Sequence, residues 1–92
     1  MLKVYITKQF RKDYQRSISR GCDPDKLQEL LNFLANEKDL PVKHKDHSLA
    51  DSKDFNHVRE CHITPDWLLI YKICKKEKTL KLIRTGTHSD LF

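Results

Sequence analysis

The pattern of apolar and polar positions predicts a short strand followed by two helices. Apolar side chains alternate with other residues over 2–6, as in a strand. Apolar or aromatic side chains then recur every four residues over 8–20, which predicts one stripe of a helix that ends at Gly21. Asp23 and the proline after it are typical of a helix start, and leucines on one face predict a second helix over 24–38. So short a connection indicates a helical hairpin with one face to be covered.

A polar loop from about Leu40 to Phe55 separates the helices from three strands. At about fifteen residues it is long for a compact domain, and such loops are often functional. Strands are predicted over 57–63, 67–73 and 79–84, joined by turns that suit antiparallel hairpins. The strand over 67–73 is apolar on both faces and is expected to be central. The order β-α-α-β-β-β predicts an α+β domain whose helical hairpin packs on one face of a mostly antiparallel, four-stranded sheet.

The composition is that of one small basic domain, residues 1–92. An apolar content of 38% supports a two-layer core but no cavity that encloses a metabolite, so we expect a surface groove and no small-molecule ligand. Eighteen Lys and Arg against thirteen Asp and Glu give a net charge of +5, which favours polyanions such as nucleic acids. Many small basic proteins bind none, so charge alone does not establish such a partner.

Three cysteines with no metal-ligand spacing indicate a reducing compartment. The sequence shows no leader segment and no apolar stretch that approaches the length of a membrane span. We therefore expect a cytoplasmic protein with no membrane partner.

Polar residues near the strand ends are the candidates for chemistry. Because side chains alternate along a strand, Glu60 and His62 are expected on one face. Asp66 lies just across the following turn, Arg84 ends the last strand and His88 follows it. His62, Asp66, Arg84 and His88 are expected to converge at one end of the sheet. Each has an ordinary interpretation too: a solvated histidine, a turn aspartate, or an arginine paired with a carboxylate. Their joint placement therefore indicates a site better than any single residue does.

A zinc site is the other use for such a group, with His47, His62, Asp66 and His88 as donors. The sequence lacks a close pair such as HxxxH, and Arg84 would oppose a cation. No metal and no cofactor are expected.

Three segments of the chain resemble the YafQ branch of the RelE/ParE toxins. They are residues 45–49 (KDHSL), 59–67 (RECHITPDW) and 84–92 (RTGTHSDLF). The resemblance extends to the length and the order of elements. It implies a RelE-like fold and the toxin of a type II toxin–antitoxin pair, which cleaves mRNA in the ribosomal A site and has a cognate antitoxin as partner.

The resemblance also implies functional residues. Those implied to be catalytic are His47, His62, Asp66, Arg84 and His88. Those expected to bind substrate are Trp67 and Phe92, which would hold or stack a base, with Lys45 and Arg59. Relatives usually carry H-x-L-x-G-x-W after the first histidine, and residues 49–55 have neither the glycine nor the tryptophan. The path of residues 48–56 is therefore not predicted, and His47 is the residue expected to lie out of place.

The chemistry needs no metal. A histidine titrates near pH 6.5, so it can take the proton of the 2′-hydroxyl or give one to the 5′-oxygen, and Arg84 suits the phosphorane charge. Our hypothesis places His88 and Asp66 nearest the scissile phosphate, with His47 and His62 assisting; which group is the base stays open. Lysines are expected to contact the RNA backbone, at positions 43, 45, 53 and in the 75–78 turn.

Two other functions stay open. A ParE-like toxin would share the fold and act on DNA gyrase, although the histidine-rich cluster argues against it. A non-catalytic basic RNA-binding or partner-binding module would make the histidines individually dispensable.

Overall fold

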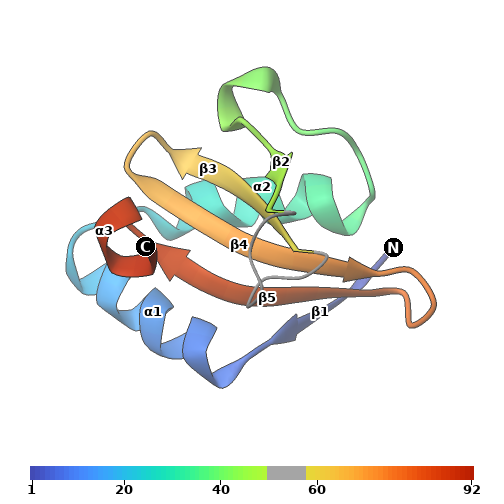
Figure 1. Cartoon of the computed structure of the whole chain (residues 1–92), viewed down its shortest axis with the longest axis horizontal. Coiled ribbons are helices and arrows are strands. Elements are labelled where there is room, and N and C mark those ends of the chain that lie inside the picture. The colour runs from blue at the N-terminus through green and yellow to red at the C-terminus, as the bar shows by residue number, and fades with distance from the viewer. Residues whose placement is uncertain (50–57) are drawn as a thin grey trace.

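The computed structural model describes residues 1–49 and 58–92 (Figure 1). Its elements, in chain order, are β1 (Lys3–Ile6), α1 (Lys8–Ser19), α2 (Pro24–Ala35), the 3-10 helix η1 (Val42–His44), β2 (His47–Ser48), β3 (Arg59–Thr64), β4 (Trp67–Cys74), β5 (Thr79–Gly86) and α3 (His88–Leu91). In this part of the chain no helix is both long and apolar enough to cross a membrane.

The strands form one sheet in the order β1-β5-β4-β3-β2. β1 pairs with β5 in parallel, and the other neighbours are antiparallel. β4 is central, as its apolar pattern predicted. The expected count of four strands is wrong, because the short β2 adds an edge strand beside β3 within the predicted polar loop. Two residues cannot show the alternation that identifies a strand, so the pattern could not reveal it.

The helix boundaries follow from local chemistry. The side chain of Asp23 accepts a hydrogen bond from the amide of Asp25 and starts α2, as predicted. Gly21 has φ +95°, the left-handed conformation that suits the residue after a helix. The predicted end of α2 near Lys38 is wrong: the helix ends at Ala35, because Glu37 turns the chain with φ +55°.

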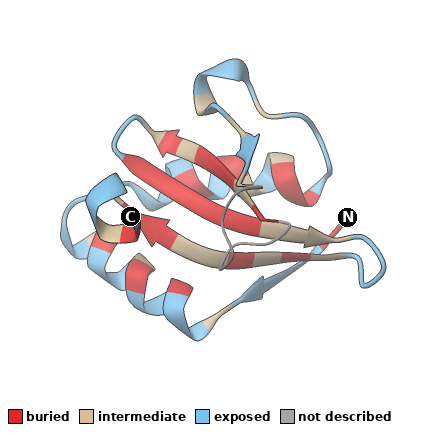
Figure 2. Ribbon diagram, in the orientation of Figure 1, coloured by how far each residue is buried: buried red, intermediate tan, exposed pale blue. Residues whose placement is uncertain are grey.

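A core lies on each face of the sheet. On one face α1 and α2 cover the larger core, which includes Phe10, Leu30 and Leu69. The opposite face has a smaller cluster in which Leu91 of α3 packs with Leu68, among others. Figure 2 shows β4 buried along most of its length between these two layers. Among the described residues this second layer is small, so this face of the sheet can carry a surface site.

Leu30→Ala should lower the free energy of unfolding by about 2–5 kcal/mol, because it leaves a cavity beneath α2. Leu30 is 1% exposed, whereas Val42 is 93% exposed and gives the matched control Val42→Ala. Urea denaturation of the three proteins measures the difference. Equal losses in the two variants would contradict this description of the core.

Candidate active site

A groove of about 520 Å³ lies where the β3–β4 turn meets α3. Its lining residues are His62, Pro65, Asp66, Leu68, Thr87, His88 and Ser89. Three of the residues singled out from the sequence, His62, Asp66 and His88, therefore lie around one hollow. Two imidazoles and a carboxylate are groups that can exchange protons with a bound molecule.

Local structure explains how these three side chains are placed. His62 lies on β3 opposite Leu68 of β4. Asp66 belongs to the turn between those strands and is exposed. His88 begins α3, which Thr87 caps: the Thr87 side chain accepts from the amide of Asp90, and the Asp90 side chain accepts from the amide of Thr87. This reciprocal capping holds a helix of one turn in place.

Glu60 is a functional candidate that sequence reasoning left outside the site. Its carboxylate is buried, and Oε1 lies 3.7 Å from Nε2 of His47 and 3.9 Å from Nε2 of His62. A buried carboxylate needs charged or hydrogen-bonding partners, and it can stabilise the positive charge of either ring when that ring holds a proton. Alternation along β3 already predicted Glu60 beside His62. The missing information was β2, which brings His47 opposite Glu60.

His47 was expected to lie out of place, and the structure puts its ring beside Glu60, outside the lining of the groove. It stands on β2, and its Nδ1 donates a 2.7 Å hydrogen bond to the carbonyl of Lys45. Because a carbonyl only accepts, Nδ1 carries the hydrogen in that bond. Nε2 then faces Glu60. The loop after it, residues 50–57, lies outside the described residues, and so does Lys53.

Arg84 is held by a carboxylate and does not line the groove. Its Nε donates to Oδ2 of Asp13 over 2.6 Å, and its Nη2 donates to Oδ1 over 3.3 Å. Asp13 belongs to α1, is 1% exposed and also accepts from the amide of Thr85. The hydrogen bond to Asp13 raises the pKa of Arg84. Arg84 donates two of its five N–H groups to Asp13, so three remain for other acceptors, and its role toward a phosphate stays a prediction.

The two aromatic residues predicted to grip a base differ in exposure. Trp67 is 2% exposed and belongs to the core under the helices, so the prediction that it stacks on a base is wrong. The prediction came from its position in the family motif, but its ring lies in the core between the sheet and the helices. Phe92 is 60% exposed, and its ring centre lies 5.0 Å from that of His88. Base stacking by Phe92 stays a prediction.

The two basic residues predicted to bind substrate also differ. Lys45 is exposed. Arg59 instead pairs with Asp46, its Nε lying 3.2 Å from Oδ1, and this hydrogen bond raises its pKa. Within residues 1–49 and 58–92, no group of three or more His, Cys, Asp or Glu side chains is arranged to hold a metal ion.

Comparison with known proteins identifies the family. A protein-family model described as "Bacterial toxin of type II toxin-antitoxin system, YafQ" matches residues 2–92. The chain belongs to this family. Membership in the YafQ family confirms the resemblance carried by the three sequence motifs.

Relatives of the YafQ family match in sequence and in fold. A protein of Escherichia coli named mRNA interferase toxin YafQ is 42% identical over 85 residues, which cover 91% of this chain and 88% of that protein. The crystal structure of a metal-bound toxin from Helicobacter pylori has a TM-score of 0.91 at 42% identity and covers 100% of both chains. The DinJ–YafQ complex of Escherichia coli gives 0.87 at 39% identity, covering 100% of this chain and 99% of that one. These structures confirm the predicted α+β class.

Asp90 ties the histidine-bearing helix α3 to α1. Its Oδ2 accepts from Nη1 of Arg20 over 2.7 Å, and Oδ1 lies 3.8 Å from Nη1 of Arg16. The hydrogen bond from the amide of Thr87, followed by that from Arg20, lowers the pKa of Asp90 to about 2. Gly86 fits under this residue: a Cβ there would stand 3.0 Å from the Asp90 side chain. Close approach therefore explains the glycine of the R-T-G-T-H motif.

Asp90→Asn should make the protein less stable at neutral pH and should flatten its response to acid. A carboxyl whose folded pKa is depressed stabilises the fold above its unfolded pKa and loses that contribution as pH falls. The advantage of the wild type should therefore fade between pH 3.8 and about 2. Thermal unfolding at several pH values measures it, with Asp39→Asn as an exposed control. A constant difference across that range would contradict the assignment.

Proposed function

We propose that this YafQ-family toxin is an endoribonuclease that cleaves mRNA on the ribosome and so inhibits translation in the cytoplasm. The observation that carries the proposal is the groove around which His62, Asp66 and His88 converge, with the Glu60 carboxylate beside His62. The name of the Escherichia coli relative, an mRNA interferase, supports the same reaction. The net charge of +5 suits a polyanionic substrate and a ribosomal surface.

The reaction is an internal transfer of the phosphate. The 2′-oxygen attacks phosphorus as a base removes its proton, and the bond to the 5′-oxygen breaks as an acid gives that oxygen a proton. The products are a 2′,3′-cyclic phosphate and a 5′-hydroxyl, and the scheme uses no metal. His88 and Asp66 act nearest the phosphate, since they flank the groove. His62 assists from β3, and His47 assists through the carboxylate of Glu60 that the two histidines share.

In this arrangement a protonated histidine stabilises most of the negative charge of the transition state. Asp13 compensates the charge of Arg84, so this guanidinium contributes less than an unpaired arginine would. Arg84 then serves as a partly exposed donor that Asp13 holds in place. Phe92, next to His88, offers an exposed ring for a base.

Replacing His88 or His62 by Gln should lower kcat by about 10²–10⁴-fold, because each removes a positioned proton-transfer group. Glu60→Gln should lower it less, since it removes a charge behind the histidines. Primer extension on mRNA in a translating system maps the new 5′ ends, with Lys3→Gln on β1 as the control. A chelator that removes zinc and spares magnesium should leave cleavage unchanged.

Undiminished cleavage by His88→Gln would overturn the proposed mechanism. Growth arrest with gyrase inhibition and no new 5′ ends would instead favour the ParE-like function. If the wild type binds ribosomes without cutting, the non-catalytic module is the better description.

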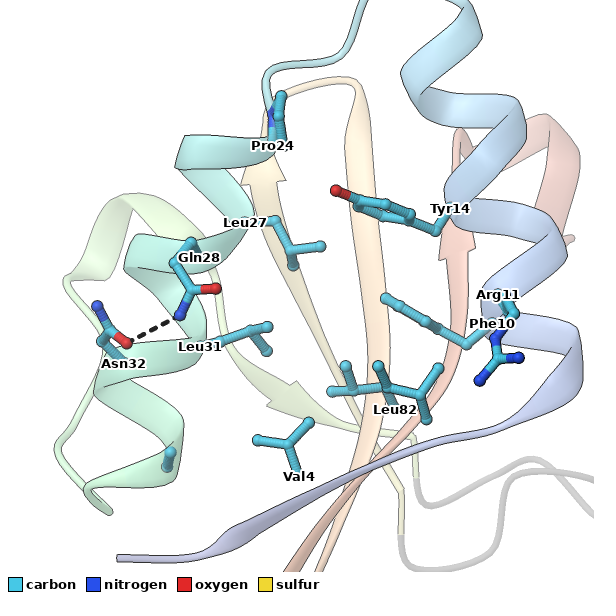
Figure 3. Close-up of a pocket in the computed structure, with 12 residues that line it drawn as sticks. Val4, Phe10, Arg11, Tyr14, Pro24, Leu27, Gln28, Leu31, Asn32 and Leu82 are labelled. Atoms are coloured by element: carbon cyan, nitrogen blue, oxygen red, sulfur yellow. Dashed lines mark hydrogen bonds between the residues drawn. The ribbon is translucent and has the colours of Figure 1, made fainter.

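A cognate antitoxin is the partner that we propose for a second surface. An apolar groove of about 500 Å³ lies between α1 and α2 over the sheet (Figure 3). Phe10 and Tyr14 point into it from α1, and Leu27 and Leu31 from α2 (Figure 3). The nearby strand β1 exposes 45% of Val4. Apolar hollows of this kind mark protein contacts, and a relative was crystallised in a DinJ–YafQ complex.

Val4→Glu should weaken binding of the antitoxin, whose gene we expect beside that of the toxin, because it places a charge at the apolar rim. Cleavage of mRNA should stay at the wild-type rate. Val42→Glu, at an exposed position outside the groove, is the matched control. Co-purification and titration calorimetry measure the binding. Wild-type affinity in Val4→Glu would place the antitoxin elsewhere.

A further inference from the structure

His47 belongs to an edge segment of the sheet, Lys45–Ser48. Strand pairing alone gives this segment few contacts. Among the described residues, β2 is two residues long and pairs with β3 through Glu60 and Arg59, and the amide of Leu49 after it donates to the carbonyl of Val58. Proton transfer requires the ring to stay in a fixed place, and a short edge strand is poor support for it. Further contacts must therefore fix this segment.

Those contacts come from Asp46, the residue before His47. Its Oδ1 accepts a 2.6 Å hydrogen bond from the Tyr71 hydroxyl and a 3.2 Å bond from Nε of Arg59. Its Oδ2 accepts from Nη2 of Arg59 over 3.3 Å. Tyr71 and Arg59 are themselves paired neighbours on β4 and β3. Asp46 is thus bonded to two adjacent strands of the sheet at once.

The partners of Asp46 are rigid and chemically matched to it. Tyr71 is 1% exposed and belongs to the core under the helices. Burial, followed by the hydrogen bond to Asp46, raises the pKa of Tyr71, so its hydroxyl keeps the hydrogen that it donates. Arg59 supplies the countercharge. Charge-assisted hydrogen bonds of this kind are stronger and more directional than neutral ones.

The backbone on the other side of Asp46 completes the arrangement. Lys45 takes a left-handed conformation, with φ +47° and ψ +43°, which a side-chain-bearing residue adopts only when its surroundings enforce it. Its carbonyl accepts from Nδ1 of His47. In a neutral ring Nε2 is then the nitrogen without a hydrogen, and it faces the Glu60 carboxylate that would stabilise it once it has taken up a proton.

We propose that Asp46, Arg59 and Tyr71 form a clamp that positions Nε2 of His47 against Glu60. The clamp rests on the proposed RNA cleavage. In it Asp46 and Tyr71 are positioning residues, which act through His47 and need not touch RNA. The clamp also gives Arg59 a role other than the substrate contact expected from the sequence.

Tyr71→Phe and Asp46→Asn test the clamp, because each removes bonding capacity and keeps the shape of the side chain. Both should lower kcat by about tenfold to a hundredfold and leave KM nearly unchanged, as a displaced proton-transfer group does. His47→Gln should cost little more in the Tyr71→Phe background than Tyr71→Phe costs alone. The controls are Tyr5→Phe on exposed β1 and Asp39→Asn, an exposed carboxylate at the rim of the hollow that Asp46 lines.

A second readout needs no RNA. The imidazole Cε1–H signal of His47, assigned with His47→Gln, should shift or broaden in both clamp variants and stay fixed in both controls. Rates are compared at a temperature where thermal unfolding shows each variant folded. An unmoved His47 signal, or additive losses in the double variant, would overturn the clamp. If the wild type cuts no RNA, the proposed function fails and the His47 signal alone decides the clamp.

Discussion

The burial of β4 on both faces is the constraint on which the rest of the structure depends. Leu68, Leu69, Ile70 and Tyr71 are successive residues of this strand, and none is more than 1% exposed. Side chains therefore leave the strand toward both sides, and both sides must be covered. Both long helices, α1 and α2, pack on the same face of the sheet. On the other face, among the described residues, Leu91 of α3 packs with a small apolar cluster, and the groove lies beside α3.

Carboxylates hold several of the cationic and titratable side chains of this protein in place. Asp13 holds Arg84, Glu60 lies between two histidines, and Asp46 anchors the segment before His47. Asp90 ties α3 to α1. The protein is strongly basic as a whole, yet four of its arginines, Arg16, Arg20, Arg59 and Arg84, are each paired with a carboxylate. The carboxylates therefore offset the charge of these arginines as well as holding them in place.

Elements with a regular spacing of apolar residues could be predicted from the sequence. The four-residue repeat located α1, and the doubly apolar run identified β4 as the central strand. Sequence reasoning could not find β2, whose two residues show no period. Nor could it see that Asp13 binds a residue 71 positions away, since a polar residue in a helix looks solvated until its partner is known. Trp67 is a different case. The motif predicted that its ring binds substrate, and only the packing shows that the ring is buried in the core.

The pairing of β5 has a consequence for when the groove can exist. This strand lies between β4 and β1, which comes from the start of the chain. The register of its pairing with β4 shifts just before Arg84, and Arg84 donates to Asp13 of α1. Contacts between such distant parts of a chain are slow to form, because closing the long loop between them costs entropy. During synthesis, the first half of the protein emerges without the strand that joins its two sides and without the helix that bears His88. A partly made chain that lacks β5 and α3 therefore has no assembled groove.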